Sequence, residues 1–183
     1  MTITVQPIDA ANLADVARID GSFTIDQKLV LAAEEDRARF TAMPVPPRRK
    51  SYDATDYTAY VGRRSKAAFL AYSDDHPAGV VALSENWNGF ALVDEILVDA
   101  EARRGGIGRA LIDATVGWAR SRRLPGVMLE TQNTNVSACR FYERCGFALG
   151  GWDRFLYQAI SPGTDEIALF WYLVFDGAPK GTP

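Results

Sequence analysis

Residues 92–111 read LVDEILVDAEARRGGIGRAL, and this stretch constrains the fold more than any other part of the chain. Its first half is an apolar run that carries two adjacent carboxylates, Asp94 and Glu95. Burying a carboxylate costs free energy unless another group pairs with it, so these residues are expected to have a partner or a chemical role. Its second half is a glycine-rich turn, which is needed where the backbone must adopt a conformation or a close approach that a side chain would prevent. Apolar residues then recur at helical spacing, so the stretch predicts a strand, a turn and a helix in that order.

The composition is that of an ordinary globular chain with one substantial core. The 183 residues are 48% hydrophobic and 23% charged, so we expect a single domain over residues 1–176 and a tail at residues 177–183. A net charge of −3 argues against a nucleic-acid or membrane surface, which needs a basic field, and suits a cationic partner. We expect a cytoplasmic protein, because the start of the chain lacks a signal-peptide pattern and no apolar run is long enough to span a bilayer.

The cysteines and the histidine argue against a metal centre. Cys139 and Cys145 lack the CxxC spacing of metal ligands and are expected to be small buried residues. His76 lies in the turn-like SDDHPAG and has no second imidazole with which to share a metal. We therefore expect no metal in this protein.

Hydrophobic periodicity predicts strands and helices in a mixed order. We expect strands at 3–8, 67–72, 79–86, 90–98, 124–131, 152–157 and 166–175, and helices at 11–19, after Gly108 and at 135–145. Residues 29–43 are rich in helix formers, yet their apolar and polar residues alternate around Phe40 and EED could form a hairpin turn, so helix and hairpin both stay open. Residues 43–66 are expected to be an irregular, basic connection.

The glycine-rich turn also suggests a ligand. Backbone N–H groups at the start of a helix face the positive end of its dipole, which is a favourable place for phosphate. The Walker pattern GxxxxGK[ST] is absent, since Arg109 and Ala110 stand where Lys and Ser/Thr are needed, and the dinucleotide pattern GxGxxG does not fit this register. From the glycines alone, a plain strand-to-helix turn is an equally good interpretation.

Two ordered segments carry a resemblance to a known family. RRGGIG at 103–108 resembles the Q/R-x-x-G-x-G/A pyrophosphate loop of the GNAT N-acetyltransferase superfamily, and NVSACRFYERCGF at 135–147 resembles its second cofactor segment. IDGSFT, NWN, LETQNTNVSACRFYERCGFALGG and the closing FWY are similar to the streptothricin (nourseothricin) acetyltransferases, over almost all of residues 10–176. The chain departs from these proteins at 46–60, where PPRRKSYDATDYTAY replaces an acidic insert, and at Arg104, where the superfamily often has glycine.

The resemblance implies an α/β (α+β) fold. It implies a mixed, mostly antiparallel sheet of about seven strands, with helices on both faces and a splay between the fourth and fifth strands, at 90–98 and 124–131. It also favours a hairpin over residues 27–45. Acetyl-CoA is the implied cosubstrate, a small cationic amine the implied acceptor, and a monomer or homodimer the implied assembly.

The same resemblance assigns the cofactor contacts mainly to backbone groups. In the family, the splayed fourth strand grips pantetheine, and an N–H near Ile96 to Val98 stabilises the oxyanion. Asn135 is expected both to cap its helix and to bind the pantetheine amides. The cofactor residues are expected to be Ile96, Leu97, Val98, Arg103, Arg104, Gly105, Gly106, Ile107, Gly108, Arg109, Asn135 and Ala138.

Three side chains are candidates for proton transfer. The resemblance places Tyr142 near the sulfur as a general acid, although Tyr142 also fits a core aromatic. It places Asp94 toward the acceptor as a general base, and Glu130, which interrupts an apolar strand, is the second candidate. Because successive strand residues point to opposite faces, Glu95 is expected on the other face from Asp94, in a surface salt bridge.

The acceptor site is expected to include Asp20, Ser22, Phe23, Asp26 and Trp87, with the acids supplying negative field and the indole stacking on a flat group. We therefore expect an acetyl-CoA-dependent N-acetyltransferase acting on the β-lysine amine of streptothricin-type antibiotics. Two alternatives are an enzyme that acetylates a peptide or protein amine and a non-catalytic acyl-CoA-binding sensor.

Overall fold

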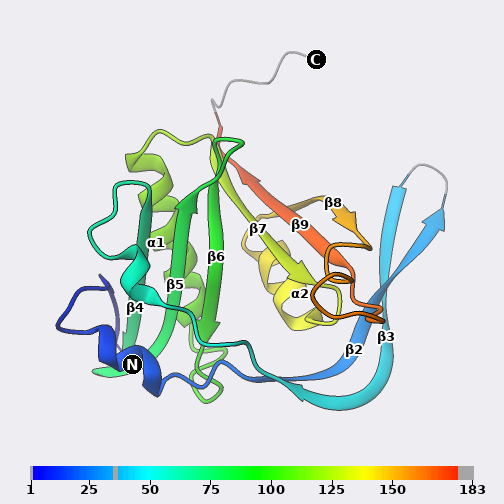
Figure 1. Cartoon of the computed structure of the whole chain (residues 1–183), viewed down its shortest axis with the longest axis horizontal. Coiled ribbons are helices and arrows are strands. Elements are labelled where there is room, and N and C mark those ends of the chain that lie inside the picture. Colours follow the sequence, from blue (N-terminus) through cyan, green and yellow to red (C-terminus); the bar gives the residue numbers. More distant parts are fainter. Residues whose placement is uncertain (1, 35–36, 177–183) are drawn as a thin grey trace. The chain divides into compact units, whose positions relative to one another are not determined.

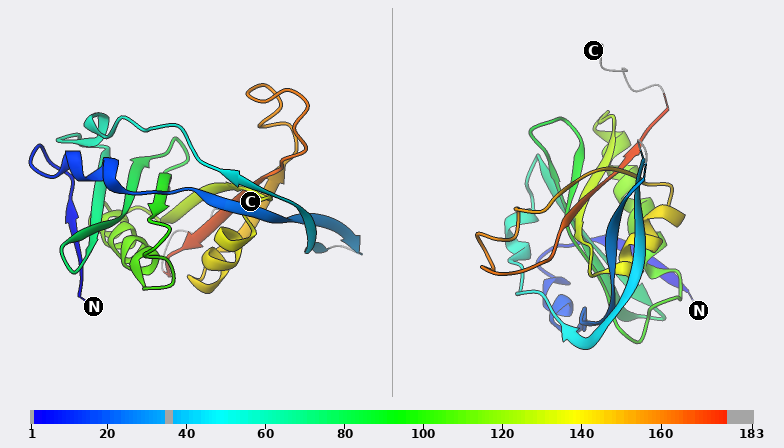
Figure 2. Two further views of the ribbon diagram at one scale, coloured as in Figure 1. Left: turned by 90° about the horizontal axis from the view of Figure 1, so that it is seen from below. Right: turned by 90° about the vertical axis from the view of Figure 1, so that its right-hand side faces the viewer.

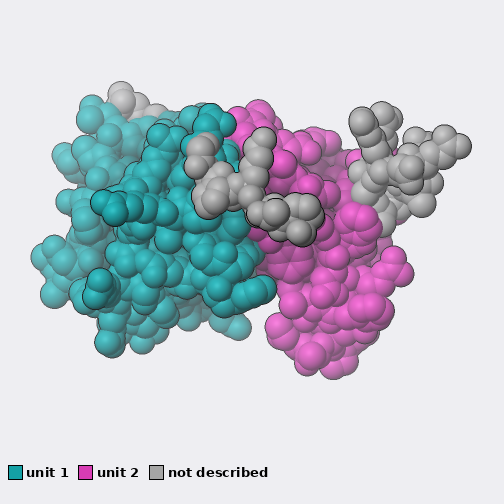
Figure 3. Space-filling model, turned by 90° about the horizontal axis from the view of Figure 1, so that it is seen from above, with its two compact units in different colours: residues 1–22, 51–129, 173–183 teal, residues 23–50, 130–172 magenta. Residues whose placement is uncertain are grey.

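A computed structural model describes residues 2–34 and 37–176 (Figure 1). Two compact units divide the chain, and each is described by itself (Figure 3). Unit 1 comprises residues 1–22, 51–129 and 173–183, and unit 2 comprises residues 23–50 and 130–172. The expected turn at 34–36 and the expected tail at 177–183 lie wholly or partly outside the described residues.

Strands dominate the described residues, with two α-helices and two short 3₁₀ helices. In chain order these elements are β1 (Ile3–Pro7), η1 (Leu13–Arg18), β2 (Phe23–Glu34), β3 (Arg37–Lys50), η2 (Tyr57–Tyr60), β4 (Lys66–Ser73), β5 (His76–Glu85), β6 (Ala91–Val98), α1 (Ile107–Ser121), β7 (Gly126–Gln132), α2 (Val136–Arg144), β8 (Ala148–Asp153) and β9 (Ala168–Val174).

The expected mixed sheet is confirmed. Its seven strands are ordered β1-β4-β5-β6-β7-β9-β8. Strands β1, β4, β5 and β6 pair antiparallel, as do β8 and β9, whereas β6 pairs parallel with β7 through Ala91–Val93 and Val127–Leu129. The parallel pair needs a crossover, and α1 provides it.

Strands β2 and β3 form a separate antiparallel hairpin, as the resemblance indicated. The hairpin is longer than predicted: residues 43–50, expected to be irregular, belong to β3. Pro44, Pro46 and Pro47 are tolerated there because a two-stranded sheet has a free edge on each strand, where the missing N–H is not needed for pairing.

In unit 1, helices cover both faces of the sheet, as expected (Figure 2). Helix α1 packs on β4, β5 and β6 and buries Leu111 and Ile112. The opposite face carries η1 and η2 over a cluster that includes Leu70, Val80 and Tyr57.

The helix expected over 11–19 is present only as the 3₁₀ helix η1. Leu13, Val16 and Ile19 still pack against the core cluster, as the sequence pattern indicated. Their spacing of three residues matches the three residues per turn of a 3₁₀ helix, so a short 3₁₀ segment aligns them on one face.

In unit 2, an ion-pair network holds the hairpin to the segment before β9. Lys50 pairs with Glu166 at 2.8 Å, Arg48 pairs with Glu166 at 3.1 Å, and Lys28 pairs with Asp165. The backbone of Asn133 receives a bond from Leu29 N at 2.9 Å and donates one to Ile167 O at 2.9 Å. The hairpin is therefore anchored by both charge and backbone pairing.

The predicted strand over 152–157 is wrong after Asp153, where β8 ends. Asp153 Oδ1 accepts a bond from Phe155 N at 2.7 Å, which bends the chain into a turn. Phe155 is 67% exposed, so this apolar run does not face a core. β9 also begins at Ala168, two residues later than expected, since Glu166 is used in the ion-pair network.

Gly79 of β5 sets how closely α1 can approach the sheet. A Cβ at this position would lie 2.8 Å from Ile107 Cγ2, 2.9 Å from the Leu97 carbonyl oxygen and 3.1 Å from Leu111 Cδ1. Both backbone and core side chains would have to move, because interiors are close-packed. The first turn of α1 therefore depends on a glycine here.

We predict that Gly79→Ala lowers the free energy of unfolding by about 1–3 kcal/mol, since overpacking a tight site displaces its neighbours. Gly117→Ala in α1 is the matched control, because its new Cβ meets nothing within 4 Å. It should raise stability by about 0.5–1 kcal/mol through helix propensity. Urea unfolding midpoints check both changes, and an unshifted midpoint in Gly79→Ala would contradict the prediction.

Candidate functional site

The glycine-rich turn of unit 1 leads into α1 with the geometry of an anion site. Gly106 is the N-cap residue at φ 92°, a conformation that favours glycine, and no acidic residue lies in the first helical turn. Helix geometry gives the N–H groups of Ile107 and Gly108 no acceptor within the helix, and the helix dipole adds positive potential there. Arg104, also at positive φ (65°), is exposed beside this helix start.

The Arg103 side chain forms hydrogen bonds with backbone carbonyls of the protein. Its Nη2 donates to the Ser22 carbonyl at 2.6 Å and to the Val98 carbonyl at 3.2 Å, and its Nε donates to Val98 at 3.3 Å. The guanidinium thus ties the turn both to the end of β6 and to the segment around Ser22. Its charge is partly committed to these carbonyls, which leaves anion binding in this turn mainly to backbone N–H groups.

Asn135 caps α2 in unit 2, as predicted. Its Oδ1 accepts bonds from Ala138 N and from Ser137 Oγ, both at 3.2 Å. The cap uses the carbonyl oxygen of the side chain, and the amide NH₂ remains the only donor group on this side chain.

Tyr142 of α2 lies in an aromatic cluster of unit 2 and is 5% exposed. Its ring centroid is 5.4 Å from Phe141, 5.8 Å from Phe147 and 6.4 Å from Trp171. These neighbours hold the ring in place and keep its surroundings largely apolar. Tyr142 is therefore both a core aromatic and a rigidly positioned phenol.

A β-bulge in β6 corrects the expected orientation of the two acids. Ala82 pairs with Glu95 while Leu83 pairs with Val93, so Asp94 is an extra residue in the ladder. The bulge breaks the alternation of faces. Tyr57 donates to Glu95, and Tyr60, three residues later on η2, bonds to Asp94. Both carboxylates therefore face η2, and the expectation that they lie on opposite faces is wrong.

Asp94 lies in a polar cluster of unit 1. Ser84 Oγ donates to Asp94 Oδ1 at 2.9 Å, and Tyr60 also bonds to the carboxylate. Burial raises the pKa of Asp94, against the opposing effect of these hydrogen bonds and of the Lys66 charge. Asp94 nevertheless keeps exposed surface. The raised pKa therefore reflects partial burial of the carboxylate, part of which remains in contact with solvent. Burial and the nearby Asp94 raise the pKa of Tyr60 to about 12.

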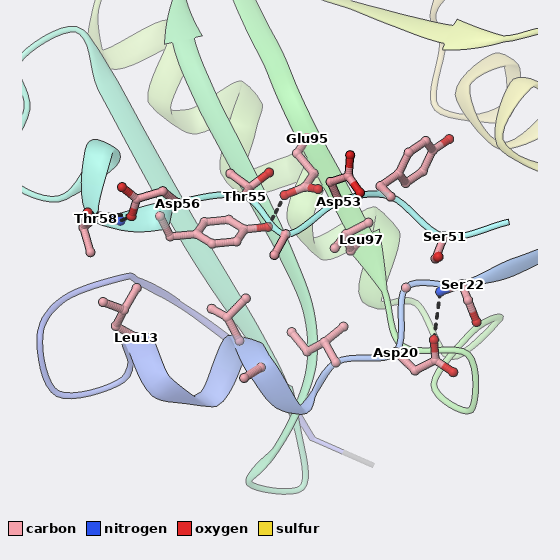
Figure 4. Close-up of a pocket in the computed structure, with 17 residues that line it drawn as sticks. Leu13, Asp20, Ser22, Ser51, Asp53, Thr55, Asp56, Thr58, Glu95 and Leu97 are labelled. Carbon is pink, nitrogen blue, oxygen red and sulfur yellow. Dashed lines mark hydrogen bonds between the residues drawn. The ribbon is translucent and has the colours of Figure 1, made fainter. Parts of the chain in front are cut away.

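Glu95 lines a cavity of about 610 Å³ in unit 1, which was not expected (Figure 4). Its partner is the Tyr57 hydroxyl, in place of the expected salt bridge. The cavity is lined by Leu13, Val16, Ala17, Ile19, Asp20, Gly21, Ser22, Ser51, Tyr52, Asp53, Ala54, Thr55, Asp56, Tyr57, Thr58, Glu95 and Leu97. Four of these residues are acids and none is Lys, Arg or His, so the side chains of the lining contribute negative charge to the cavity.

Glu130 of unit 2 is the second perturbed acid. Burial raises the pKa of Glu130 to about 7; the Lys50 charge opposes this shift and the Glu166 charge adds to it. The Tyr157 hydroxyl donates to Glu130. The pKa of Glu166 shifts in the opposite direction. Burial raises it, but hydrogen bonds from Lys50 and Thr134 outweigh burial and lower the pKa overall. A carboxyl with a pKa near 7 can exchange a proton at neutral pH.

The five residues expected at the acceptor site belong to three different segments of the chain. Asp20 and Ser22 line the cavity, where Ser22 N donates to Asp20 Oδ1 at 2.9 Å. Phe23 and Asp26 belong to β2 in unit 2, with Asp26 exposed at a bulge. Trp87 lies in the turn before β6, outside the cavity lining, and is 93% exposed.

Asp53, Asp56 and Tyr57 also line the cavity and were not expected at a functional site. All three follow the basic PPRRK, and the whole stretch 46–60 was treated as one basic segment. The available signal was the change of charge after Lys50, where the chain reads SYDATDYT.

The described residues, 2–34 and 37–176, hold neither a metal-ligand cluster nor a membrane-spanning helix. No group of three or more His, Cys, Asp or Glu side chains among them is arranged to hold a metal ion. No helix in this part of the chain is long and apolar enough to cross a membrane.

Known proteins resemble this chain closely. Residues 31–147 match the model of the acetyltransferase (GNAT) family. Streptothricin acetyltransferase A of Bacillus subtilis (strain 168) is 36% identical over 166 residues, which cover 90% of this chain and 95% of the relative. An Escherichia coli streptothricin acetyltransferase is 33% identical over 178 residues, covering 97% of this chain and 98% of the relative.

Solved structures agree with this relationship. A Bacillus anthracis (strain Ames) protein in complex with acetyl coenzyme A has a TM-score of 0.90 at 35% identity, covering 95% of this chain and 100% of the other. A nourseothricin acetyltransferase has a TM-score of 0.78 at 31% identity, covering 95% of this chain and 99% of the other. The matches extend over nearly the whole chain, and the chain belongs to the GNAT acetyltransferase family.

Proposed function

We propose that this enzyme transfers the acetyl group of acetyl-CoA to the β-lysine amine of streptothricin-type antibiotics and so inactivates them. The observation that carries the proposal is the cavity beside β6, whose lining holds four carboxylates and no cationic side chain. Such a lining favours a small polycation over a neutral or anionic acceptor. Two relatives that match over nine-tenths or more of this chain are streptothricin acetyltransferases, which supports the same acceptor.

The start of α1 fits the pyrophosphate of acetyl-CoA. Gly106 at φ 92° turns the chain so that the helix begins without an acid in its first turn. Residues 103–109 would hold the pyrophosphate through backbone N–H groups, and Asn135 and Ala138 are proposed to contact the pantetheine arm. The bound cosubstrate supplies the activated acetyl thioester. Backbone N–H groups near Ile96 to Val98 are proposed to stabilise the oxyanion.

Proton transfer can be divided among three side chains. Asp94, with its raised pKa, accepts a proton from the acceptor ammonium, and Glu130 is the second candidate for this step. The neutral amine nitrogen then forms a bond to the acetyl carbon while the carbon–sulfur bond breaks. Tyr142 donates a proton to the departing thiolate. The nitrogen loses its second proton as the amide forms, and this proton restores the Tyr142 hydroxyl. Asp94 releases the first proton to solvent, so the products are an acetamide, a free thiol and one proton.

The function is tested by measuring free thiol released from acetyl-CoA in the presence of nourseothricin. We expect thiol release that depends on the antibiotic, together with an antibiotic product heavier by one acetyl group in mass analysis. Thiol release without acceptor does not count as support. Absence of acceptor-dependent release with nourseothricin would overturn the acceptor assignment.

We predict that Gly108→Val abolishes saturable acetyl-CoA binding, because a branched side chain in the first turn of α1 blocks the approach of a pyrophosphate to the backbone. Arg104→Ala should weaken binding only mildly, since backbone groups carry the contact. Calorimetric titration of the folded variants measures both. Unchanged affinity in Gly108→Val would show that the cofactor does not bind at this turn.

Tyr142→Phe should lower turnover by about 10²- to 10⁴-fold with little change in the Michaelis constants, as expected for a general acid. The ring keeps its contacts with Phe147 and Trp171, so the fold should be retained. Steady-state kinetics at saturating substrates provide the measurement. Near-normal turnover would assign Tyr142 to the aromatic core alone.

Asp94→Asn should depress turnover and leave acetyl-CoA affinity intact, because an amide of the same shape cannot accept a proton. In the parent enzyme, kcat/KM should fall as the pH drops through the raised pKa of Asp94, where the base becomes protonated. Turnover of the variant should recover in part at high pH, where more of the acceptor is already neutral. A variant that matches the parent at every pH would transfer the base role to Glu130, tested with Glu130→Gln.

A further inference from the structure

We infer that Tyr60 of η2 is a positioning residue for Asp94, and that its hydroxyl holds this carboxylate ready to accept a proton. The inference rests on the proposed function, in which Asp94 is the base, and adds a residue that acts through that base. Tyr60 lies outside the two segments that resemble the GNAT motifs, at 103–108 and 135–147, so its place in the fold carries the argument.

The bulge in β6 and the short helix η2 bring the two residues together. The bulge breaks the alternation of the strand and turns Asp94 toward η2. Residues three apart lie on one face of a 3₁₀ helix, so Tyr57 and Tyr60 share a face of η2. Tyr57 bonds to Glu95 and Tyr60 bonds to Asp94, one tyrosine for each carboxylate. Tyr57 is buried in the core cluster, which anchors η2 and limits where Tyr60 can lie.

Two neighbouring strands complete the surroundings of this carboxylate. Ser84 Oγ of β5 donates to Asp94 Oδ1 at 2.9 Å. Lys66 of β4 pairs with Ser84 in the β4–β5 ladder, and Lys66 Nζ lies 5.0 Å from the centroid of the Tyr60 ring. A cation over the face of a phenol is attracted to the ring, so Lys66 helps to hold Tyr60 in place. The three elements η2, β5 and β4 thus each contribute one group around Asp94.

The Tyr60 hydroxyl is suited to be a permanent donor at neutral pH. Burial raises the pKa of Tyr60 to about 12, and the charges of Asp94 and Glu95 add to this effect, so the hydroxyl keeps its proton. Burial also raises the pKa of Asp94, whereas its two hydroxyl bonds and the Lys66 charge lower it. Loss of the Tyr60 hydroxyl would leave burial less opposed, so the pKa of Asp94 should rise further.

A purely structural role for Tyr60 predicts a different result. Its ring is partly buried and packs against the core cluster, which by itself would account for an aromatic residue here. Tyr60→Phe separates the two roles, because phenylalanine keeps the ring and its face toward Lys66 and loses only the hydroxyl. Tyr72→Phe is the matched control, since Tyr72 lies in the same cluster and its hydroxyl donates to a different carboxylate, Asp15, at 2.8 Å.

The contact is tested without any substrate, by carboxyl ¹³C NMR titration of protein labelled at aspartate. The signal of Asp94 is the one that is missing in Asp94→Asn. We expect its titration midpoint to move up by about one pH unit in Tyr60→Phe, given the strength of hydrogen bonds to charged groups, and to stay in place in Tyr72→Phe. An unmoved midpoint in Tyr60→Phe would overturn the inference, whether or not the protein acetylates nourseothricin.

The positioning role is tested by kinetics with nourseothricin. In Tyr60→Phe the acidic limb of kcat/KM should move to higher pH by the same amount, because Asp94 is then protonated at a higher pH. In an Asp94→Asn background, Tyr60→Phe should change kcat/KM by less than about twofold, since its effect passes through the missing carboxylate. An unmoved limb, or an equal loss in both backgrounds, overturns the positioning role. If nourseothricin is not acetylated at all, the proposed function fails and the NMR titration decides the inference by itself.

Discussion

The bulge in β6 is the constraint on which the proposed acceptor side of this protein depends. In a regular ladder, Asp94 and Glu95 would point to opposite faces, and one of them would lie under α1. The extra residue between the Ala82–Glu95 and Leu83–Val93 pairs turns both carboxylates toward η2. One strand thus supplies a carboxylate with a raised pKa and, next to it, a carboxylate in the wall of a cavity. The two tyrosines of η2 are spaced to bond both.

The proposed cofactor side depends instead on backbone geometry. Gly79 permits close packing of α1 on β5, Gly106 turns the chain into the helix, and Arg103 holds the turn against the carbonyls of Ser22 and Val98. Substitution of any of these residues would disturb the turn or its packing, even if the residue itself does not contact a ligand. The motif arginine thereby has a conformational task that the motif alone does not indicate.

The sequence predicted the elements with strong periodicity and the segments with family motifs. The strand–turn–helix at 92–111 and the Asn135 cap were expected and are present. The faces of Asp94 and Glu95 were not predictable, because a bulge depends on which residues pair across β5 and β6, and alternation within one strand does not reveal this. The cavity was not predicted for a similar reason: tertiary packing alone brings Asp53 and Tyr57 into the same cavity lining as Glu95, and neighbouring basic residues dominate their local sequence.

The negative lining also bears on how fast an acceptor is captured. A cavity lined by charges of one sign focuses the field and can raise association rates for oppositely charged ligands by about 10- to 10³-fold at low ionic strength. Asp20, Asp53, Asp56 and Glu95 all line this cavity, so their charges would attract a polycation before any specific bond forms. Under the proposed function, this gain in encounter rate would speed the capture of a cationic acceptor that is present at low concentration. The same field would repel anionic metabolites and keep them from competing for the cavity.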